Sequence, residues 1–225
     1  MTATQLASTL RPVKHVFFDF DGPVCAVFAG LPARDVAGQM YEALRPSLGS
    51  AIPEGWATET DPLALLRSVA DARPDLTSMA DSLLASLETE AVVLAAETPG
   101  GESAIRACAD SGRSVWIVSN NSGTAIRMYL TSRGLDVAGV FGRVPGDPAS
   151  MKPSPRLLLD AMSASSAAPA SCVFIGDAAR DVEAGTAAGV ATIGYANKAG
   201  KAATLAAAGA VVVTDSMDAI ANALR

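Results

Sequence analysis

Short apolar runs rich in Val, Ile and Phe recur along the chain, and segments with helical spacing of apolar residues separate them. Such runs are typical of parallel strands that are buried on both faces of a sheet. Because parallel strands need crossover connections, the alternation predicts an α/β fold with helices on both faces of one parallel sheet. We expect strands at residues 13–20, 115–119, 172–176, 192–195 and 211–214, and helices between them at 101–110, 124–133, 155–163 and 182–188.

One long segment interrupts this alternation, because it contains no apolar run that resembles a buried strand. Its apolar spacing and its helix start signals, Asp61-Pro62 and Asp75 after Pro74, predict several helices. Between residues 23 and 100 it also carries eleven acidic residues against four arginines and no lysine, whereas the rest of the chain is close to neutral. We therefore predict a core formed by residues 1–23 and 99–225 and an α-helical insert at 24–98, with helices at 34–44, 62–71 and 76–96.

Acidic side chains follow the first predicted strand, in the sequence DFDGPV. Asp19 and Asp21 appear at the strand's end, where open parallel sheets bind their ligands, and Gly22 allows the backbone to turn. One carboxylate could attack a phosphorus atom while the second transfers protons. The alternative interpretation is a solvated turn that happens to contain two acids.

The next two strands also end in polar residues. Ser119 and Asn120, in VSNNSG, offer a hydroxyl and an amide before a helix N-terminus, where they could bind an anion or simply cap the helix. Asp177 and Asp181, in GDAARD, lie four residues apart at the start of a helix. Together with the first acids they offer the oxygen ligands that suit Mg²⁺, although Asp181 could instead stabilise the helix dipole.

Lys152 is the only lysine between Lys14 and Lys198, and it precedes the helix that leads to the third strand. An ammonium group beside clustered carboxylates would balance their charge and bind a phosphate oxygen. A surface lysine with no role is the alternative.

The segments DFDGPV, VSN, MKP and GDAARD resemble, in order and spacing, the four motifs of the haloacid dehalogenase-like superfamily of phosphotransferases. The resemblance covers nearly the whole chain, because the helical insert is similar to the cap that closes over the active site in this family. It implies a doubly wound, Rossmann-like core with an inserted α-helical cap domain. It also implies Mg²⁺ as cofactor and an aspartyl-phosphate intermediate.

The resemblance further implies a role for each motif residue. Asp19 would be the nucleophile and a metal ligand, and Asp21 the general acid/base with its backbone carbonyl on the metal. Ser119 and Lys152 would bind the transferring phosphoryl group, with help from Asn120. The remaining metal ligands would be Asp177 and Asp181. Phe28 and Arg34 are candidates for substrate contact, because they lie where the cap begins.

The sequence departs from the family pattern at two places. Pro23 stands where many members have Thr, and Ala178, Ala179 and Arg180 separate the acids of the fourth motif. We expect Arg180 to pair with a neighbouring acid, as a helix-face arginine commonly does. A second anionic group on the substrate would be expected to meet a cap cation, for which the candidates are Arg34, Arg45, Arg67 and Arg73. Hinges that open the cap are expected near residues 23–25 and 98–101, because Gly and Pro mark breaks in regular structure at both crossings.

These features favour a phosphomonoester hydrolase that acts on a small phosphorylated metabolite. A sugar-phosphate mutase of the same superfamily shares the motif residues and remains an alternative. A dehalogenase is disfavoured by the second acid and the metal ligands, and a phosphonate hydrolase by the absence of lysine from the insert. A receiver-like or non-catalytic phosphate-binding protein is disfavoured by the long insert and by the presence of both Asp19 and Lys152.

Composition limits the partners. The net charge of −6 disfavours nucleic acid, because an acidic surface repels phosphate backbones. No apolar stretch is long enough to span a bilayer, and no secretory leader is evident, so no membrane partner and a cytoplasmic location are expected. The three cysteines lack the pattern of a disulfide framework or a metal site. The sequence gives no prediction of oligomeric state.

Overall fold

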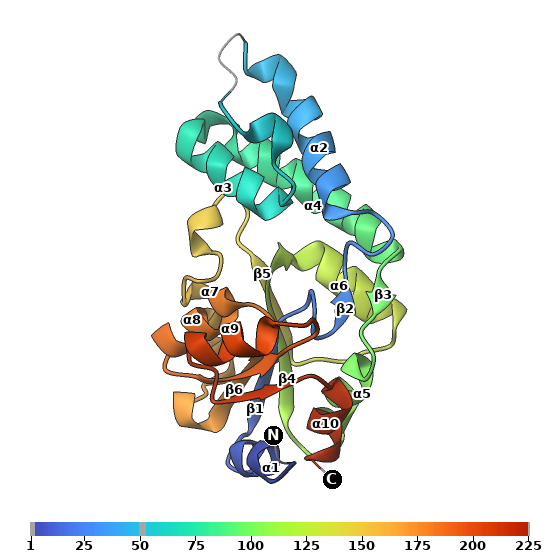
Figure 1. Cartoon of the computed structure of the whole chain (residues 1–225), viewed down its shortest axis with the longest axis vertical. Coiled ribbons are helices and arrows are strands. Elements are labelled where there is room, and N and C mark those ends of the chain that lie inside the picture. Colours follow the sequence, from blue (N-terminus) through green and yellow to red (C-terminus); the bar gives the residue numbers. More distant parts are fainter. Residues whose placement is uncertain (1–2, 50–52, 225) are drawn as a thin grey trace.

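The computed structural model describes residues 3–49 and 53–224. Its core is a six-stranded sheet in the order β5-β4-β1-β6-β7-β8, in which every neighbouring pair is parallel (Figure 1). The strands are β1 (His15–Phe18), β4 (Ser114–Ser122), β5 (Gly139–Arg143), β6 (Cys172–Gly176), β7 (Ala191–Tyr195) and β8 (Val212–Thr214). The strand order places β1 between β4 and β6, so the three strands that carry the polar motifs are neighbours.

The register of these three strands brings the motif residues to one edge of the sheet. Phe18 lies opposite Ile117 on one side and Ile175 on the other. One residue after Phe18 comes Asp19, and two residues after its partners come Ser119 and Asp177. The predicted convergence of polar groups therefore follows from strand pairing alone.

Helices cover both faces of the sheet, so the predicted doubly wound α/β core is confirmed. Because side chains alternate along a strand, Val16 and Phe18 face one side and Phe17 the other. The first face packs against α1 (Ala3–Leu10), α5 (Gly101–Asp110), α6 (Gly123–Ser132) and α10 (Met217–Asn222). The second packs against α7 (Arg156–Ser165) and α8 (Ala179–Ala187), and α9 (Lys201–Ala208) contacts α8, β7 and β8.

The described part of the insert contains three α-helices, α2 (Ala33–Leu44), α3 (Pro62–Ala72) and α4 (Thr77–Val93), which form a layer beyond the end of the sheet (Figure 1). They share an apolar cluster of their own, which includes Met40, Leu66 and Leu84. Asp61 caps α3 as its sequence predicts, because its side chain accepts a hydrogen bond from the backbone N–H of Leu63 at 2.9 Å. The helices agree with the prediction, and the domain boundaries at residues 24 and 98 stay predictions.

Several elements were not predicted. Two short strands, β2 (Cys25–Ala26) and β3 (Ala96–Glu97), pair antiparallel where the chain enters and leaves the insert. The edge strand β5 was missed because it contains two glycines and only two apolar side chains. Both glycines are needed for close packing: a Cβ on Gly139 would lie 2.7 Å from the Trp116 ring, and one on Gly142 would lie 2.5 Å from the backbone N of Gly123. The helices α1, α9 and α10 were also missed.

Cys25, Cys108 and Cys172 are all free and buried. Among the described residues, no helix has both the length and the apolar character that crossing a membrane requires.

Gly142 offers a test of the packing between β5 and the loop that follows β4. Replacing Gly142 with Ala should lower the free energy of unfolding by about 1–3 kcal/mol, because the new methyl group meets backbone atoms that cannot move aside easily. The matched control is Gly38→Ala in the exposed face of α2, where nothing lies within 4 Å. That change should stabilise the protein by about 0.5–1 kcal/mol, through helix propensity. Urea unfolding measures both, and equal effects would contradict the packing assignment.

Candidate active site

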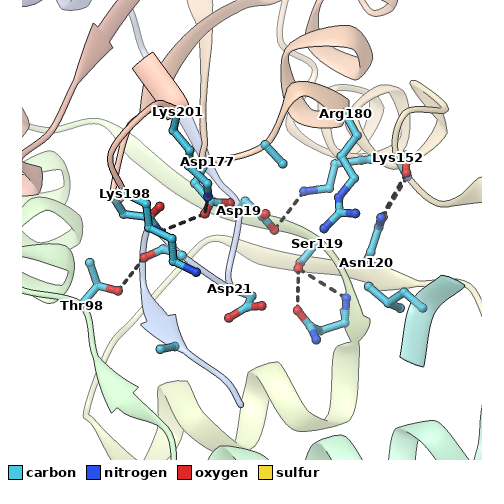
Figure 2. Close-up of a pocket in the computed structure, with 16 residues that line it drawn as sticks. Asp19, Asp21, Thr98, Ser119, Asn120, Lys152, Asp177, Arg180, Lys198 and Lys201 are labelled. Carbon is cyan, nitrogen blue, oxygen red and sulfur yellow. Dashed lines mark hydrogen bonds and ion pairs between the residues drawn. The ribbon is translucent and has the colours of Figure 1, made fainter. Parts of the chain in front are cut away.

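A cavity of about 330 Å³ lies at the carboxyl ends of β1, β4 and β6 (Figure 2). Six of the nine predicted site positions line it, namely Asp19, Asp21, Ser119, Asn120, Lys152 and Asp177. Asp181 lies directly behind them and is fully buried. The other two, Phe28 and Arg34, are outside it.

Asp19 occupies the centre of the group. Its backbone N–H donates to the carbonyl of Ile175 at 2.8 Å, which extends the pairing of β1 with β6 by one residue. Its Oδ1 accepts from the N–H of Phe20 at 2.7 Å and lies 2.9 Å from Nζ of Lys152. Burial raises the pKa of Asp19 to about 7; Lys152 opposes this shift, and the negative charge of Asp181 adds to it. A further cation beside Asp19 would therefore favour its ionised, nucleophilic form.

Lys152 is 1% exposed and bridges two carboxylates, since its Nζ also lies 2.7 Å from Oδ1 of Asp181. Burial alone would lower the pKa of Lys152, but attraction to Asp181 and Asp19 outweighs this effect and leaves the pKa above its usual value. The amine is therefore charged. The side-chain amide of Asn120 holds the lysine backbone at both polar atoms, accepting from its N–H at 2.8 Å and donating to its carbonyl at 3.1 Å.

Asp21 lies on the loop that leads into the insert. Its Oδ1 accepts from the N–H of Val27 at 2.9 Å, and burial raises the pKa of Asp21 to about 6 although this hydrogen bond opposes the shift. Gly22 adopts a positive φ of 113°, and a Cβ there would lie 2.5 Å from the Asp177 carboxyl carbon. Only glycine therefore fits between Asp21 and the fourth motif. Thr98 ties the other end of the insert to this loop, because its Oγ1 donates to the Gly22 carbonyl at 2.5 Å.

Asp19, Asp177 and Asp181 could hold a metal ion, because each offers a carboxylate oxygen within 4.8 Å of the others. Asp181 uses its Oδ2 to accept from the N–H groups of Asp177 and Ala178, at 3.1 and 3.0 Å. Asn197 and Lys201 both bind Oδ2 of Asp177, so within the described part of the chain its Oδ1 has no partner. A set of hard carboxylate oxygens of this kind fits Mg²⁺.

Cations at the rim of the cavity come from the core. Arg180, Lys198 and Lys201 line it, whereas Leu63 is the only residue of α2, α3 or α4 that does so. The prediction that Arg180 pairs with a neighbouring acid is wrong: over residues 3–49 and 53–224 it forms no ion pair, and Figure 2 shows its guanidinium turned toward Ser119 and Asn120. The reason is that α8 presents this position to the cavity rather than to a neighbouring helix.

The predicted substrate contacts of the insert do not reach the cavity. Phe28 packs half-buried against the apolar clusters, and Arg34 is exposed and pairs with Asp35 at 3.4 Å. The other insert arginines are also engaged elsewhere: Arg45 pairs with Glu42, Arg73 pairs with Asp75, and Arg67 donates to the Lys152 carbonyl at 2.9 Å. The expectation that they supply the cavity's cations is therefore corrected.

Lys198 and Lys201 line the cavity but are not among the predicted site residues, although the sequence carries a signal for them. The chain has only four lysines, and three of them line this cavity. The scarcity that drew attention to Lys152 applied equally to the other two. Thr98 and Asn121, which also line the cavity, carried no comparable signal.

The ion pairs of Lys152 give a testable prediction for stability. Lys152→Met leaves two buried carboxylates without their cation and should lower the free energy of unfolding by about 3–5 kcal/mol. Lys14→Met, at an exposed position, should change it by less than about 0.5 kcal/mol. Both are measured by urea unfolding with a chelator present. A small loss in Lys152→Met would show that the carboxylates do not depend on this cation.

Comparison with known proteins identifies the fold and the family. No curated protein matches the sequence. Among solved structures, the fold is similar to a predicted phosphatase from Clostridium acetobutylicum (16% identity, 93% of this chain and 97% of that one, TM-score 0.70). It is also similar to a candidate beta-phosphoglucomutase from Bacteroides vulgatus (17%, 100% of both chains, 0.66) and to CbbY from Rhodobacter sphaeroides in complex with phosphate (15%, 91% and 95%, 0.63).

These likenesses establish the fold. The family follows from the sequence itself, because residues 13–189, well over half of the chain, match the haloacid dehalogenase-like hydrolases. That range includes all four motifs and the whole insert. The chain is therefore a member of the haloacid dehalogenase-like hydrolase family.

Proposed function

We propose that this hydrolase is a Mg²⁺-dependent phosphatase that removes the phosphoryl group from a small phosphorylated metabolite. The observation that carries the proposal is the position of the Asp19 carboxylate, which lies at the cavity beside a buried, charged Lys152 and within a cluster of three carboxylates. A carboxylate nucleophile and an anionic phosphate repel each other, so the reaction needs cations at this point. Bound Mg²⁺ would supply further positive charge between nucleophile and phosphoryl group.

Each residue then has a defined task. A carboxylate oxygen of Asp19 attacks phosphorus, and the bond to the leaving oxygen breaks as Asp21 gives that oxygen a proton. Asp21 next takes a proton from water, whose oxygen attacks phosphorus and releases phosphate, which restores Asp19. Ser119 and Lys152 bind the phosphoryl oxygens. Asn120 acts by fixing the Lys152 backbone, because both polar atoms of its amide are already engaged there.

The size and charge of the site favour a small substrate. The cavity lies at the lower end of the volumes that small-molecule sites have, about 300–1,000 Å³. A net charge of −6 disfavours nucleic acid and anionic membrane surfaces as partners. Arg180 and Lys198 line the cavity without an ion pair in the described ranges, so we infer that the substrate carries a second anionic group beside its phosphate.

Hydrolysis of a generic aryl phosphate tests the chemistry. Wild-type turnover should require Mg²⁺, and Asp19→Asn should reduce kcat by at least about 1,000-fold, because the amide cannot attack phosphorus. The matched control is Asp35→Asn, which removes an exposed carboxylate of the insert and should leave kcat unchanged. Conversion of a hexose phosphate without release of inorganic phosphate would instead indicate a mutase. Metal-independent turnover that survives in Asp19→Asn would contradict the proposal.

The second anionic group is tested by comparing substrates with and without a carboxylate. Arg180→Gln should raise KM about 10-fold for a phosphorylated carboxylic acid, since one charge-assisted hydrogen bond is lost, and should leave KM for an aryl phosphate nearly unchanged. Arg34→Gln, which alters an exposed arginine outside the cavity, is the control and should affect neither substrate. Equal effects of Arg180→Gln on KM for both substrates would contradict the inference that the substrate carries a second anionic group.

A further inference from the structure

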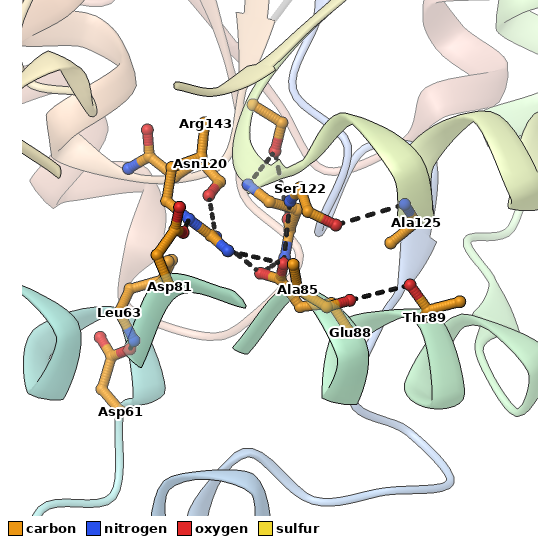
Figure 3. A network of polar contacts seen from close by, with 12 residues as sticks. Asp61, Leu63, Asp81, Ala85, Glu88, Thr89, Asn120, Ser122, Ala125 and Arg143 are labelled. Carbon is orange, nitrogen blue, oxygen red and sulfur yellow. Dashed lines mark hydrogen bonds and ion pairs between the residues drawn. The ribbon is translucent and has the colours of Figure 1, made fainter. Parts of the chain in front are cut away.

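A buried cluster of charges joins α4 of the insert to the end of β5 in the core (Figure 3). Nε of Arg143 lies 2.5 Å from Oδ1 of Asp81, and its Nη1 and Nη2 donate to the two oxygens of Glu88 at 3.0 and 3.1 Å. Glu88 is fully buried, and the other two side chains are nearly so. Burying three charges is costly unless each is paired and hydrogen-bonded, as these are.

Glu88 does more than pair with this arginine. Its Oε1 accepts from the side-chain amide of Asn121 at 3.1 Å, and its Oε2 accepts from the backbone N–H of Ser122 at 2.9 Å. Both partners belong to residues 119–122, the segment after the apolar part of β4 that carries the phosphate-binding Ser119. Arg143 adds a hydrogen bond from Nη1 to the carbonyl of Asn120 at 2.8 Å. Residues 119–122, the phosphate-binding segment, are therefore held by Glu88 of the insert and by Arg143, the arginine with which Glu88 pairs.

The chain of contacts continues to the Ser119 hydroxyl. Ser119 Oγ donates to Oδ1 of Asn121 at 3.1 Å, and the Asn121 backbone N–H donates to Oγ at 3.4 Å. An ionised carboxylate only accepts hydrogen bonds, so Glu88 requires the NH₂ group of Asn121 to face it. This leaves Oδ1 facing Ser119. Glu88 thereby fixes the orientation of the Asn121 amide, and the amide fixes the position of Oγ.

We propose that Glu88 is a positioning residue for phosphoryl transfer, which acts through the Asn121 amide on Ser119 of the phosphate-binding segment. The inference rests on the proposed function, in which Ser119 binds the phosphoryl group. Glu88 does not line the cavity, so it has no direct contact with substrate. Its effect comes from holding Oγ of Ser119 beside the phosphoryl group. The hydroxyl turns its single proton from Oδ1 of Asn121 to a phosphoryl oxygen when that group binds, and small displacements of such groups slow reactions strongly. The insert thus contributes to the reaction through the contact of α4, which carries Glu88, with Asn121 of the core.

Asp81 provides a control that distinguishes the positioning role of Glu88 from simple attachment of the insert to the core. It lies on the same helix and binds the same arginine, but its second oxygen accepts from the N–H of Gly146 at 2.8 Å rather than from residues 119–122. Glu88→Gln and Asp81→Asn each remove one negative charge from Arg143. Only the first removes the carboxylate that orients Asn121.

The experiment measures kcat, KM and urea unfolding for both variants, with an aryl phosphate as substrate. Both should lose stability, whereas kcat should fall about 10- to 100-fold in Glu88→Gln and stay within about threefold of wild type in Asp81→Asn. In an Asn121→Ala background, Glu88→Gln should lower kcat no further, because the contact through which it acts is already gone. Equal kcat effects of the two charge-removing variants, or a full effect of Glu88→Gln without Asn121, would overturn the proposal.

A binding measurement makes the result independent of turnover. Inorganic phosphate is titrated in the presence of Mg²⁺ while NMR follows the backbone amides of residues 119–122. Glu88→Gln should weaken phosphate binding about 10-fold, and Asp81→Asn should not. A wild type that binds phosphate but hydrolyses no ester would refute the proposed phosphatase function, while this comparison still decides the role of Glu88. Equal affinity in wild type and Glu88→Gln, or no phosphate binding at residues 119–122 of the wild type, would overturn the positioning role.

Discussion

The buried ammonium of Lys152 allows three carboxylates to share one end of the sheet. Asp19, Asp177 and Asp181 have oxygens within 4.8 Å of one another, and like charges at that distance disfavour each other's ionised form. Lys152 touches two of the three and offsets part of that repulsion. Its position is determined in turn by the Asn120 amide, which holds the lysine backbone from β4. The second and third motifs are therefore one structural unit, although 32 residues separate them.

The insert is joined to this unit by charge as well as by chain connection. Its excess of acids distinguishes it in the sequence, and two of those acids, Asp81 and Glu88, are buried against Arg143 of the core. Part of the charge imbalance is thus complementary to the core rather than a property of a solvated surface. Because Arg143 and Glu88 also bind residues 120–122, the same cluster connects the insert to the segment for which phosphate binding is proposed.

The sequence was sufficient for the parts of the molecule that depend on local pattern. Apolar runs and helix start signals predicted most strands and helices, and strand ends predicted Asp19, Ser119 and Asp177 at the cavity. Nearness along the chain failed as a guide to nearness in space. Phe28 and Arg34 follow the first motif closely, yet the β2–β3 pairing directs the chain away from the cavity. The contact between Arg143 and Glu88 spans 55 residues and joins two elements whose packing no local pattern reveals.

The same contacts bear on how an insert of this kind can move. Hinges near residues 23–25 and 98–101 stay a prediction, and at these crossings β2 pairs with β3 and Thr98 donates to the Gly22 carbonyl. Swinging α4 away from the core would also separate Arg143 from both of its acids, and the hydrogen bonds that Glu88 accepts from Asn121 and Ser122 would have to be exchanged for water. The contacts of α2 with the rest of the chain lie mainly within the insert. A movement of α2 alone would therefore leave the contacts of α4 with Arg143 and with residues 121–122 intact, and with them the contact between Asn121 and the Ser119 hydroxyl.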